Sequence, residues 1–274
     1  MKKASFLCYF LLCMLLLSCS RPSLLEQTLL IAEENRVELE KVLDHYKKNE
    51  DKRKYEAAQF LISNMGNKFG YEGEILEKYR PVFEVHDSLY NISDSLLKLY
   101  QKDTLLLEKG TFKRNHEAIE TVWNKLTQKY GLISHSKLTH IYDCKVLSAN
   151  FLIQNIENAF LAWEASPTYN PDDFELFCEY ILPHRITNES PEVYREKYYT
   201  QFKHILDTAT NIPSIINGFR NELYNNLKYR HSQILWDYSA GISISQMEKI
   251  HSGACKHMTS FQALVMKACG LPVT

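Results

Sequence analysis

The sequence is poor in residues that break helices and in patterns that mark strands. Its 274 residues include only 9 glycines and 8 prolines. Apolar and polar residues alternate clearly only in residues 241–245, and so short a segment cannot form a stable sheet by itself. Few breakers along a chain of this length argue against a turn-rich β fold. We therefore predict an all-α protein of long helices packed as in a helical bundle.

No part of the sequence forms a basic run or patch. Apolar residues (45%) and charged residues (24%) occur at the frequencies of an ordinary globular protein. The 32 basic and 33 acidic residues give a formal net charge of −1. Proteins that bind nucleic acids usually carry a basic patch that contacts the phosphate groups. A nucleic-acid partner is therefore not expected.

The sequence also lacks an apolar run long enough to cross a bilayer, which needs about 20 residues. The run Phe6–Leu17 is shorter than this and follows the basic pair Lys2 and Lys3. A basic start, a short apolar segment and then a small residue are typical of a secretion signal. We therefore interpret residues 1–18 as a signal peptide.

The end of this signal carries a second pattern. Residues 16–19, Leu-Leu-Ser-Cys, resemble the lipobox of bacterial lipoproteins. The resemblance implies that Cys19 becomes the lipidated first residue of the mature protein, so that the N-terminal lipid attaches the chain to a membrane of the cell envelope. Ser20 follows, rather than the aspartate that retains such proteins in the inner membrane, so the outer membrane is the predicted location. The alternative is ordinary signal cleavage with an unmodified cysteine.

Cysteine is sparse and its spacing matches no familiar cross-link pattern. Beyond Cys19, the mature chain holds Cys144, Cys178, Cys255 and Cys269. In an oxidising compartment these four could form up to two disulfides. No CxxC pair occurs, however, and the spacings fit no disulfide framework. Free and mostly buried thiols are the expected state.

Apolar residues recur at spacings of three and four along most of the chain, which predicts amphipathic helices. Two capping boxes, Ser23 with Glu26 and Asp172 with Glu175, mark helix starts. The predicted helices cover residues 23–46, 55–65, 117–130, 138–163, 172–182, 191–207, 212–229 and 254–269.

The last of these predicted helices, residues 254–269, has a cysteine near its start. Gly270 suits the position just after a helix, and Pro272 would stop the helix there. Cys255 lies in the first turn, where free backbone N–H groups and the positive end of the helix dipole favour a thiolate. The thiolate is the reactive form of cysteine, and the same N–H groups are suited to one side of an oxyanion hole. The pattern therefore predicts Cys255 as a candidate nucleophile.

Residues 253–272 resemble the nucleophile helix of the transglutaminase-like superfamily. That superfamily usually has Gly-x-Cys, an apolar helix, an arginine and then Gly-Ile-Pro. Here Lys267 stands in place of the arginine and Leu271 in place of the isoleucine. Residues 156–167 and 172–185 also look like the helical leader of bacterial lipoproteins that carry this domain.

The resemblance implies a papain-like Cys-His-Asp site in an α+β domain. The parent activity would be acyl transfer on peptide amides, by a protease or amidase or by a protein crosslinker, with a peptide or protein substrate and no cofactor. Only Cys255 is carried over, because the histidine and the acidic residue of the superfamily lie downstream on strands, and the sequence stops at Thr274. We therefore expect an inactive fragment with a helical N-terminal region (19–165), followed by a helical leader and an incomplete core (166–274).

Two histidines near Cys255 offer alternative chemistry. His257 follows two positions later, so on a helix the two side chains point about 200° apart. His251 precedes the helix, and nothing in the pattern orients it towards the sulfur. A zinc ion needs three or four converging ligands, and no second cluster adds to these residues. No metal is therefore expected.

A different class of function remains open from the sequence alone. The chain could be a non-catalytic α-helical lipoprotein that acts as a binding or scaffold module at the membrane. In that interpretation the cysteine-bearing helix is a vestige of an ancestral enzyme.

Overall fold

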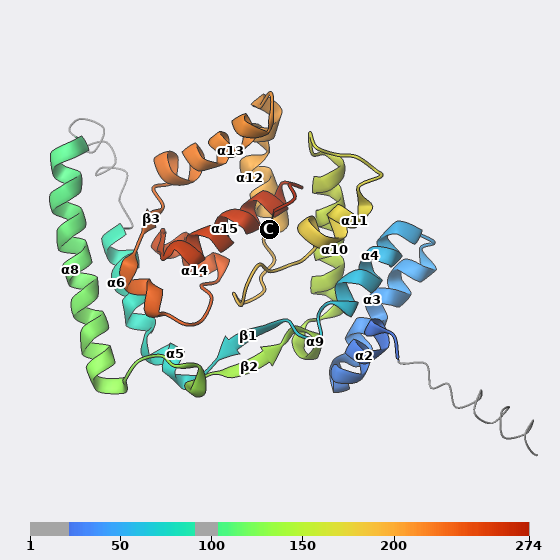
Figure 1. The fold of residues 1–274 in the computed structure, drawn as a ribbon, viewed down its shortest axis with the longest axis horizontal. Coiled ribbons are helices and arrows are strands. Elements are labelled where there is room, and N and C mark those ends of the chain that lie inside the picture. Colours follow the sequence, from blue (N-terminus) through green and yellow to red (C-terminus); the bar gives the residue numbers. More distant parts are fainter. Residues whose placement is uncertain (1–21, 91–103, 274) are drawn as a thin grey trace, which may run out of the picture.

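The computed structural model describes residues 22–90 and 104–273 and is mostly helical, which confirms the predicted all-α class (Figure 1). Two π-helices, Phe177–Ile181 and Glu222–Asn226, follow α11 and α13. The helices are α2 (Leu24–Ile31), α3 (Arg36–Lys48), α4 (Lys52–Ser63), α5 (Glu74–Lys78), α6 (Arg80–Tyr90), α8 (Thr104–Tyr130), α9 (Asp143–Val146), α10 (Ala149–Glu164), α11 (Phe174–Leu176), α12 (Arg195–Thr208), α13 (Ile212–Asn221), α14 (Ile244–Ile250) and α15 (Cys255–Ala268).

Two small sheets lie among the described helices. β1 (Phe69–Glu72) pairs antiparallel with β2 (Thr139–Tyr142), and β3 (Arg230–His231) pairs in parallel with β4 (Ser252–Gly253). Figure 1 shows the β1–β2 pair running between α5 and α9. Each strand is too short to form a sheet without a partner, so the pairing depends on segments that are distant in the sequence.

The single helix predicted for residues 138–163 is wrong. The chain forms β2, then the short α9, and only then α10. Ser148 separates the last two, because its Oγ accepts a hydrogen bond from Phe151 N–H (3.3 Å) and so caps the start of α10. The apolar periodicity therefore identified α10 but extended it too far towards the N-terminus.

The alternating residues 241–245 belong to a helix start and not to a strand. Ser243 Oγ accepts from Gln246 N–H (3.3 Å), and Gln246 Oε1 accepts from Ser243 N–H (3.2 Å). This reciprocal capping box begins α14. The alternation does not correspond to two faces of a strand, because Ile242, Ser243 and Ile244 are all buried.

The two capping boxes predicted from the sequence have different outcomes. The box of Ser23 and Glu26 is confirmed, with Ser23 N–H donating to Glu26 Oε2 (2.8 Å). The box at Asp172 and Glu175 is wrong, because α11 begins after Asp173, whose side chain forms no capping hydrogen bond.

The buried apolar side chains of the described residues form two clusters. The first joins α2, α3 and α4 to α10 and the first π-helix, and includes Leu39, Ile156 and Phe177. The second joins α5, α6 and α8 to α12, α13, α14 and α15, and includes Phe202 and Val265. In Figure 1 the helices of the first cluster lie on one side of the molecule, α8 lies on the other, and α15 lies between them. The cysteine-bearing helix is therefore packed into the middle of the fold.

A buried ion cluster attaches the segment before α12 to the β1–β2 pair. Asp143 is fully buried and accepts hydrogen bonds from His184 Nε2 (2.8 Å) and from Arg185 Nη2. Arg185 Nη1 also donates to the carbonyl of Phe69 (2.7 Å). A buried charge is tolerated only with such partners, so this cluster holds the chain that follows residue 183 in one position.

Candidate functional site

The predicted nucleophile occupies the first position of a long helix. Cys255 is the first residue of α15, and its side chain is exposed. Ala254 at the N-cap has no hydroxyl or carboxylate to bond the first-turn N–H groups. The unpaired N–H groups of that turn therefore remain available near the sulfur.

The glycine two residues before Cys255 is required by close packing. Gly253 lies in β4 opposite His231, and its carbonyl accepts from Ser232 N–H (2.9 Å). A Cβ atom at this position would lie 2.9 Å from the Cβ of His257, a separation that real side chains do not adopt. The Gly-x-Cys pattern thus reflects how tightly β4 approaches the first turn of α15.

Tyr224 is one titratable residue whose pKa depends on charge at Cys255. Burial raises the pKa of Tyr224, Arg220 lowers it, and a negative charge on Cys255 raises it by a smaller amount. No hydrogen bond joins the Cys255 sulfur to another residue within 22–90 and 104–273. In the described part of the chain, the sulfur therefore has no base in contact with it.

His257 faces away from the sulfur and is buried. Its Nδ1 accepts from Ala254 N–H (3.3 Å), so the neutral ring carries its hydrogen on Nε2. Nε2 is buried without a hydrogen-bond partner, although the nearby carbonyls of Ala240 and Tyr238 favour protonation of the ring. Burial, reinforced by the charge of Lys256, nevertheless lowers the pKa of His257 to about 4. The imidazole is therefore neutral at pH 7.

We predict that protonation of His257 opposes folding in acid. Its folded pKa of about 4 lies below the usual value of 6.5, so between these values the unfolded state binds the extra proton. Stability is therefore fully present above pH 6.5 and falls as the pH falls towards 4, by about 2–3 kcal/mol for this residue. His257→Gln should flatten the curve of urea-derived stability against pH by that amount. Parallel curves for the two proteins would contradict the prediction.

The side chain of His251 also contacts residues other than Cys255. It ends α14 in the left-handed conformation (φ 44°), and its Nδ1 lies 2.7 Å from the carbonyl of Leu227. Its ring stacks on Tyr229, with ring centres 4.7 Å apart and planes 2° from parallel. Among the described residues, no group of three or more His, Cys, Asp or Glu could hold a metal ion.

The three other described cysteines are buried and free. Burial raises the pKa of Cys178 and of Cys269 to about 12, and also raises the pKa of Cys144. Thiols of this kind are unreactive because they rarely form the thiolate. Cys255 is thus the one exposed thiol within the described residues. Cys19 lies outside them.

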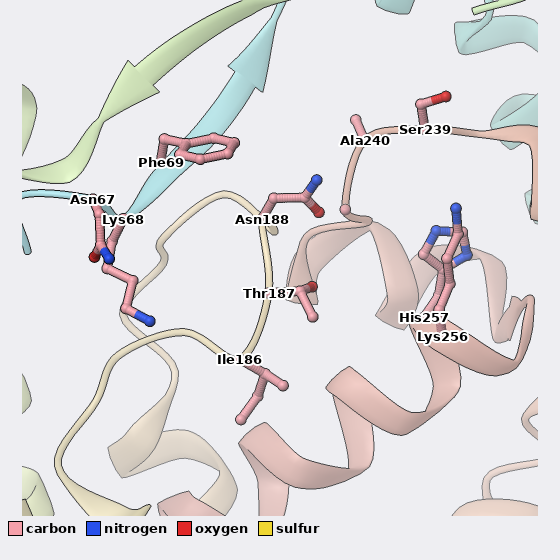
Figure 2. Close-up of a pocket in the computed structure, with 11 residues that line it drawn as sticks. Asn67, Lys68, Phe69, Ile186, Thr187, Asn188, Ser239, Ala240, Lys256 and His257 are labelled. Atoms are coloured by element: carbon pink, nitrogen blue, oxygen red, sulfur yellow. The ribbon is translucent and has the colours of Figure 1, made fainter. Parts of the chain in front are cut away.

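A pocket of about 390 Å³ opens beside the first turn of α15 (Figure 2). Cys255 does not line it. The pattern in the sequence did not reveal this pocket, because its walls come from segments that are far apart in the chain. Its lining residues are Asn67, Lys68, Phe69, Ile186, Thr187, Asn188, Ser239, Ala240, Gly241, Lys256 and His257.

Comparisons with known proteins identify no relative. The sequence matches no protein-family description and no curated protein, and the fold matches no solved structure. Within residues 22–90 and 104–273, no helix combines the length and hydropathy needed to span a membrane.

Proposed function

We propose that this chain carries the nucleophile helix of a transglutaminase-like protein whose parent activity is cysteine-dependent acyl transfer on peptide amides. The single observation that supports this proposal is the exposed thiol of Cys255 at the first position of the fourteen-residue helix α15. The unpaired backbone N–H groups of the first turn would also be placed to bond an oxyanion formed at this sulfur. The substrate would be a peptide or a protein.

The described residues would not by themselves cleave an amide. A cysteine nucleophile needs a base to take its proton and an acid to protonate the leaving amine. His257 and His251 are held by the backbone contacts of Ala254 and Leu227. The chain is therefore expected to be inactive towards peptide amides, although Cys255 can still attack an activated ester that needs no acid.

The cellular location belongs to the same proposal. An acyl chain on Cys19 would attach the protein to the outer membrane of the cell envelope, a few residues before α2 begins at Leu24. No further membrane contact is needed for the proposal.

A non-catalytic binding module is the second candidate. The observation that favours it is the pocket beside α15, which has the volume of a small-molecule site and excludes Cys255 from its lining. A protein of this kind would bind a ligand at the envelope without transforming it.

Acylation of Cys255 tests the first candidate. The full-length chain in detergent is mixed with the p-nitrophenyl ester of an N-acetylated amino acid. The sulfur forms a bond to the acyl carbon, the ester C–O bond breaks, and p-nitrophenolate leaves with the electron pair. We expect a thioester at Cys255 to form about tenfold faster in the folded chain than in urea, because only the folded chain holds backbone N–H groups beside the reacting carbonyl oxygen. Peptide mass spectrometry locates the acyl group.

Two variants control this experiment. Cys255→Ser should abolish the adduct, whereas Cys269→Ser should retain it, because Cys269 is buried. Equal rates in the folded and unfolded chains would argue against a helix-activated nucleophile and in favour of the binding module. The mass of the N-terminal peptide from the same digest tests the lipid on Cys19.

A further inference from the structure

The pocket beside α15 has walls from four segments. Residues 67–69 lead into β1, residues 186–188 precede α12, residues 239–241 precede α14, and Lys256 and His257 belong to the first turn of α15. Figure 2 shows Lys68 on one side and Lys256 with His257 on the other, with Thr187 and Asn188 between them in this view. Charged side chains and hydrogen-bond donors that are distant in the sequence therefore line the same pocket.

The lining carries positive charge and no carboxylate. Lys68 is exposed, and its ammonium group forms no hydrogen bond or ion pair with another described residue. The Lys256 ammonium donates to the carbonyl of Tyr238 (2.9 Å). The nearby carboxylate of Glu189 is buried and is bonded by the backbone N–H groups of Ile186 and Thr187. The pocket is therefore electropositive.

A buried lysine outside the lining is influenced by the charge of Lys68. Lys267 is buried, and burial together with the charges of Arg195 and Lys68 lowers its pKa to about 7, against the opposing effect of Glu189. An anion bound beside Lys68 would offset the positive charge of that lysine.

Hydrogen-bond donors without partners line the same space. The side chains of Asn67 and Asn188 form no hydrogen bond with other described residues. The ring of His257, which is only 4% exposed, carries a hydrogen on Nε2; the carbonyls of Ala240 and Tyr238 are nearby, but neither completes a hydrogen bond with it. A buried donor left unpaired carries a desolvation penalty that a bound acceptor removes, so an acceptor-rich ligand would be favoured.

We propose that this pocket binds a small organic carboxylate with an apolar body, held by Lys68, Asn67, Asn188 and the Nε2–H of His257. A carboxylate offers several lone pairs and no donor, which matches the unpaired donors of the wall. The side chains of Phe69 and Ile186 provide apolar surface for the carbon skeleton. A free phosphate ion would fill little of the 390 Å³ volume and would leave that surface uncovered. This inference is independent of the acyl-transfer proposal.

Isothermal titration of the full-length chain in detergent tests the inference. The probes are N-acetyl-leucine, its uncharged amide N-acetyl-leucinamide, and inorganic phosphate. We expect N-acetyl-leucine to bind at one site and to bind more weakly in high salt. The amide and phosphate should each bind at least about tenfold more weakly, since the first lacks the charge and the second lacks the apolar body.

Lys68→Met should weaken the binding of N-acetyl-leucine about tenfold, because it removes a charge-assisted hydrogen bond. Lys68 is exposed, so this variant is expected to fold normally. The matched control is Lys249→Met, which changes an exposed lysine of α14 that does not line the pocket and should bind as the unmodified chain does. Equal affinity of the Lys68→Met variant, tighter binding of phosphate, or absence of binding by all three probes would overturn the proposal.

Discussion

Replacement of Arg195 by methionine is expected to lower the free energy of unfolding by about 3–5 kcal/mol. Arg195 is only 2% exposed, yet no carboxylate pairs with it among the described residues. Its guanidinium instead donates to oxygen acceptors from three parts of the fold: Asn155 Oδ1 (2.7 Å), the carbonyl of Lys267 (2.9 Å), and the carbonyls of Ile181 (2.6 Å), Leu182 (3.2 Å) and Pro183 (3.1 Å).

The cost arises from the acceptors that the substitution would leave behind. Methionine fills much of the same volume but donates no hydrogen bond, so buried carbonyl groups would lose their partners at about 1–3 kcal/mol each where no water replaces the donor. These carbonyls belong to α15 and to the end of the π-helix 177–181. Arg195 therefore connects α12 to α15 and to the π-helix 177–181. Its loss should weaken the packing between the two hydrophobic clusters.

Urea unfolding followed by circular dichroism measures this effect. The matched control is Arg36→Met, which removes an arginine whose ion pair with Glu40 (2.7 Å) lies on the surface. Such exposed pairs contribute about 0–1 kcal/mol, so the control should stay close to the unmodified protein. If the two variants lost similar stability, the buried contacts of Arg195 would not have the importance assigned to them.

Gly270→Ala is expected to destabilise the protein by about 3 kcal/mol. Gly270 follows α15 with a φ of 72°, a left-handed conformation that costs an alanine about 1 kcal/mol or more. A Cβ atom there would also overlap the carbonyl of Ala162 and lie 2.7 Å from Trp163 N, at the end of α10. Both contacts are with backbone, so the helices themselves would have to separate, at a further cost of about 1–3 kcal/mol.

Gly131→Ala is the control that separates the overlap with α10 from the cost of the left-handed backbone conformation. Gly131 has nearly the same φ, 73°, but a Cβ atom there would approach only Lys137 Nζ, at 3.1 Å. The end of a flexible side chain can move, so this control should lose only the conformational cost of about 1 kcal/mol. The difference between the two variants in urea unfolding measures the close approach of α15 to α10. Equal losses would mean that the helices can separate freely.

Much of the helical fold could be predicted from the sequence. The final helix was predicted at residues 254–269 and lies at Cys255–Ala268, with Gly270 in the left-handed position after it. This agreement has a local cause, because apolar spacing, helix-stopping residues and glycine conformation act within a few residues of each other. Ser23 and Glu26 form their capping box for the same reason.

The strands could not be predicted in this way. β1 and β2 form because Phe69 and Tyr142 are brought together by the packing of helices on both sides. Neither strand has the length or alternation to mark it in isolation, so residues 138–142 looked like the start of α10. Strand pairing is a property of two distant segments, and periodicity within one segment does not report it.

The features of the candidate site also fall into two groups: those set by neighbouring residues and those set by contacts between distant segments. The residues alone predict that Cys255 lies in the first turn of a helix, that most of the chain is helical, and that the other cysteines of the fold pack as apolar residues. The exposure of Cys255, the position of His257 in the wall of a pocket, and the convergence of Lys68 and Asn188 on that pocket depend on the tertiary structure. Helix starts are set by neighbouring residues, whereas burial, unpaired donors and clustered charges depend on which distant segments the hydrophobic cores bring into contact.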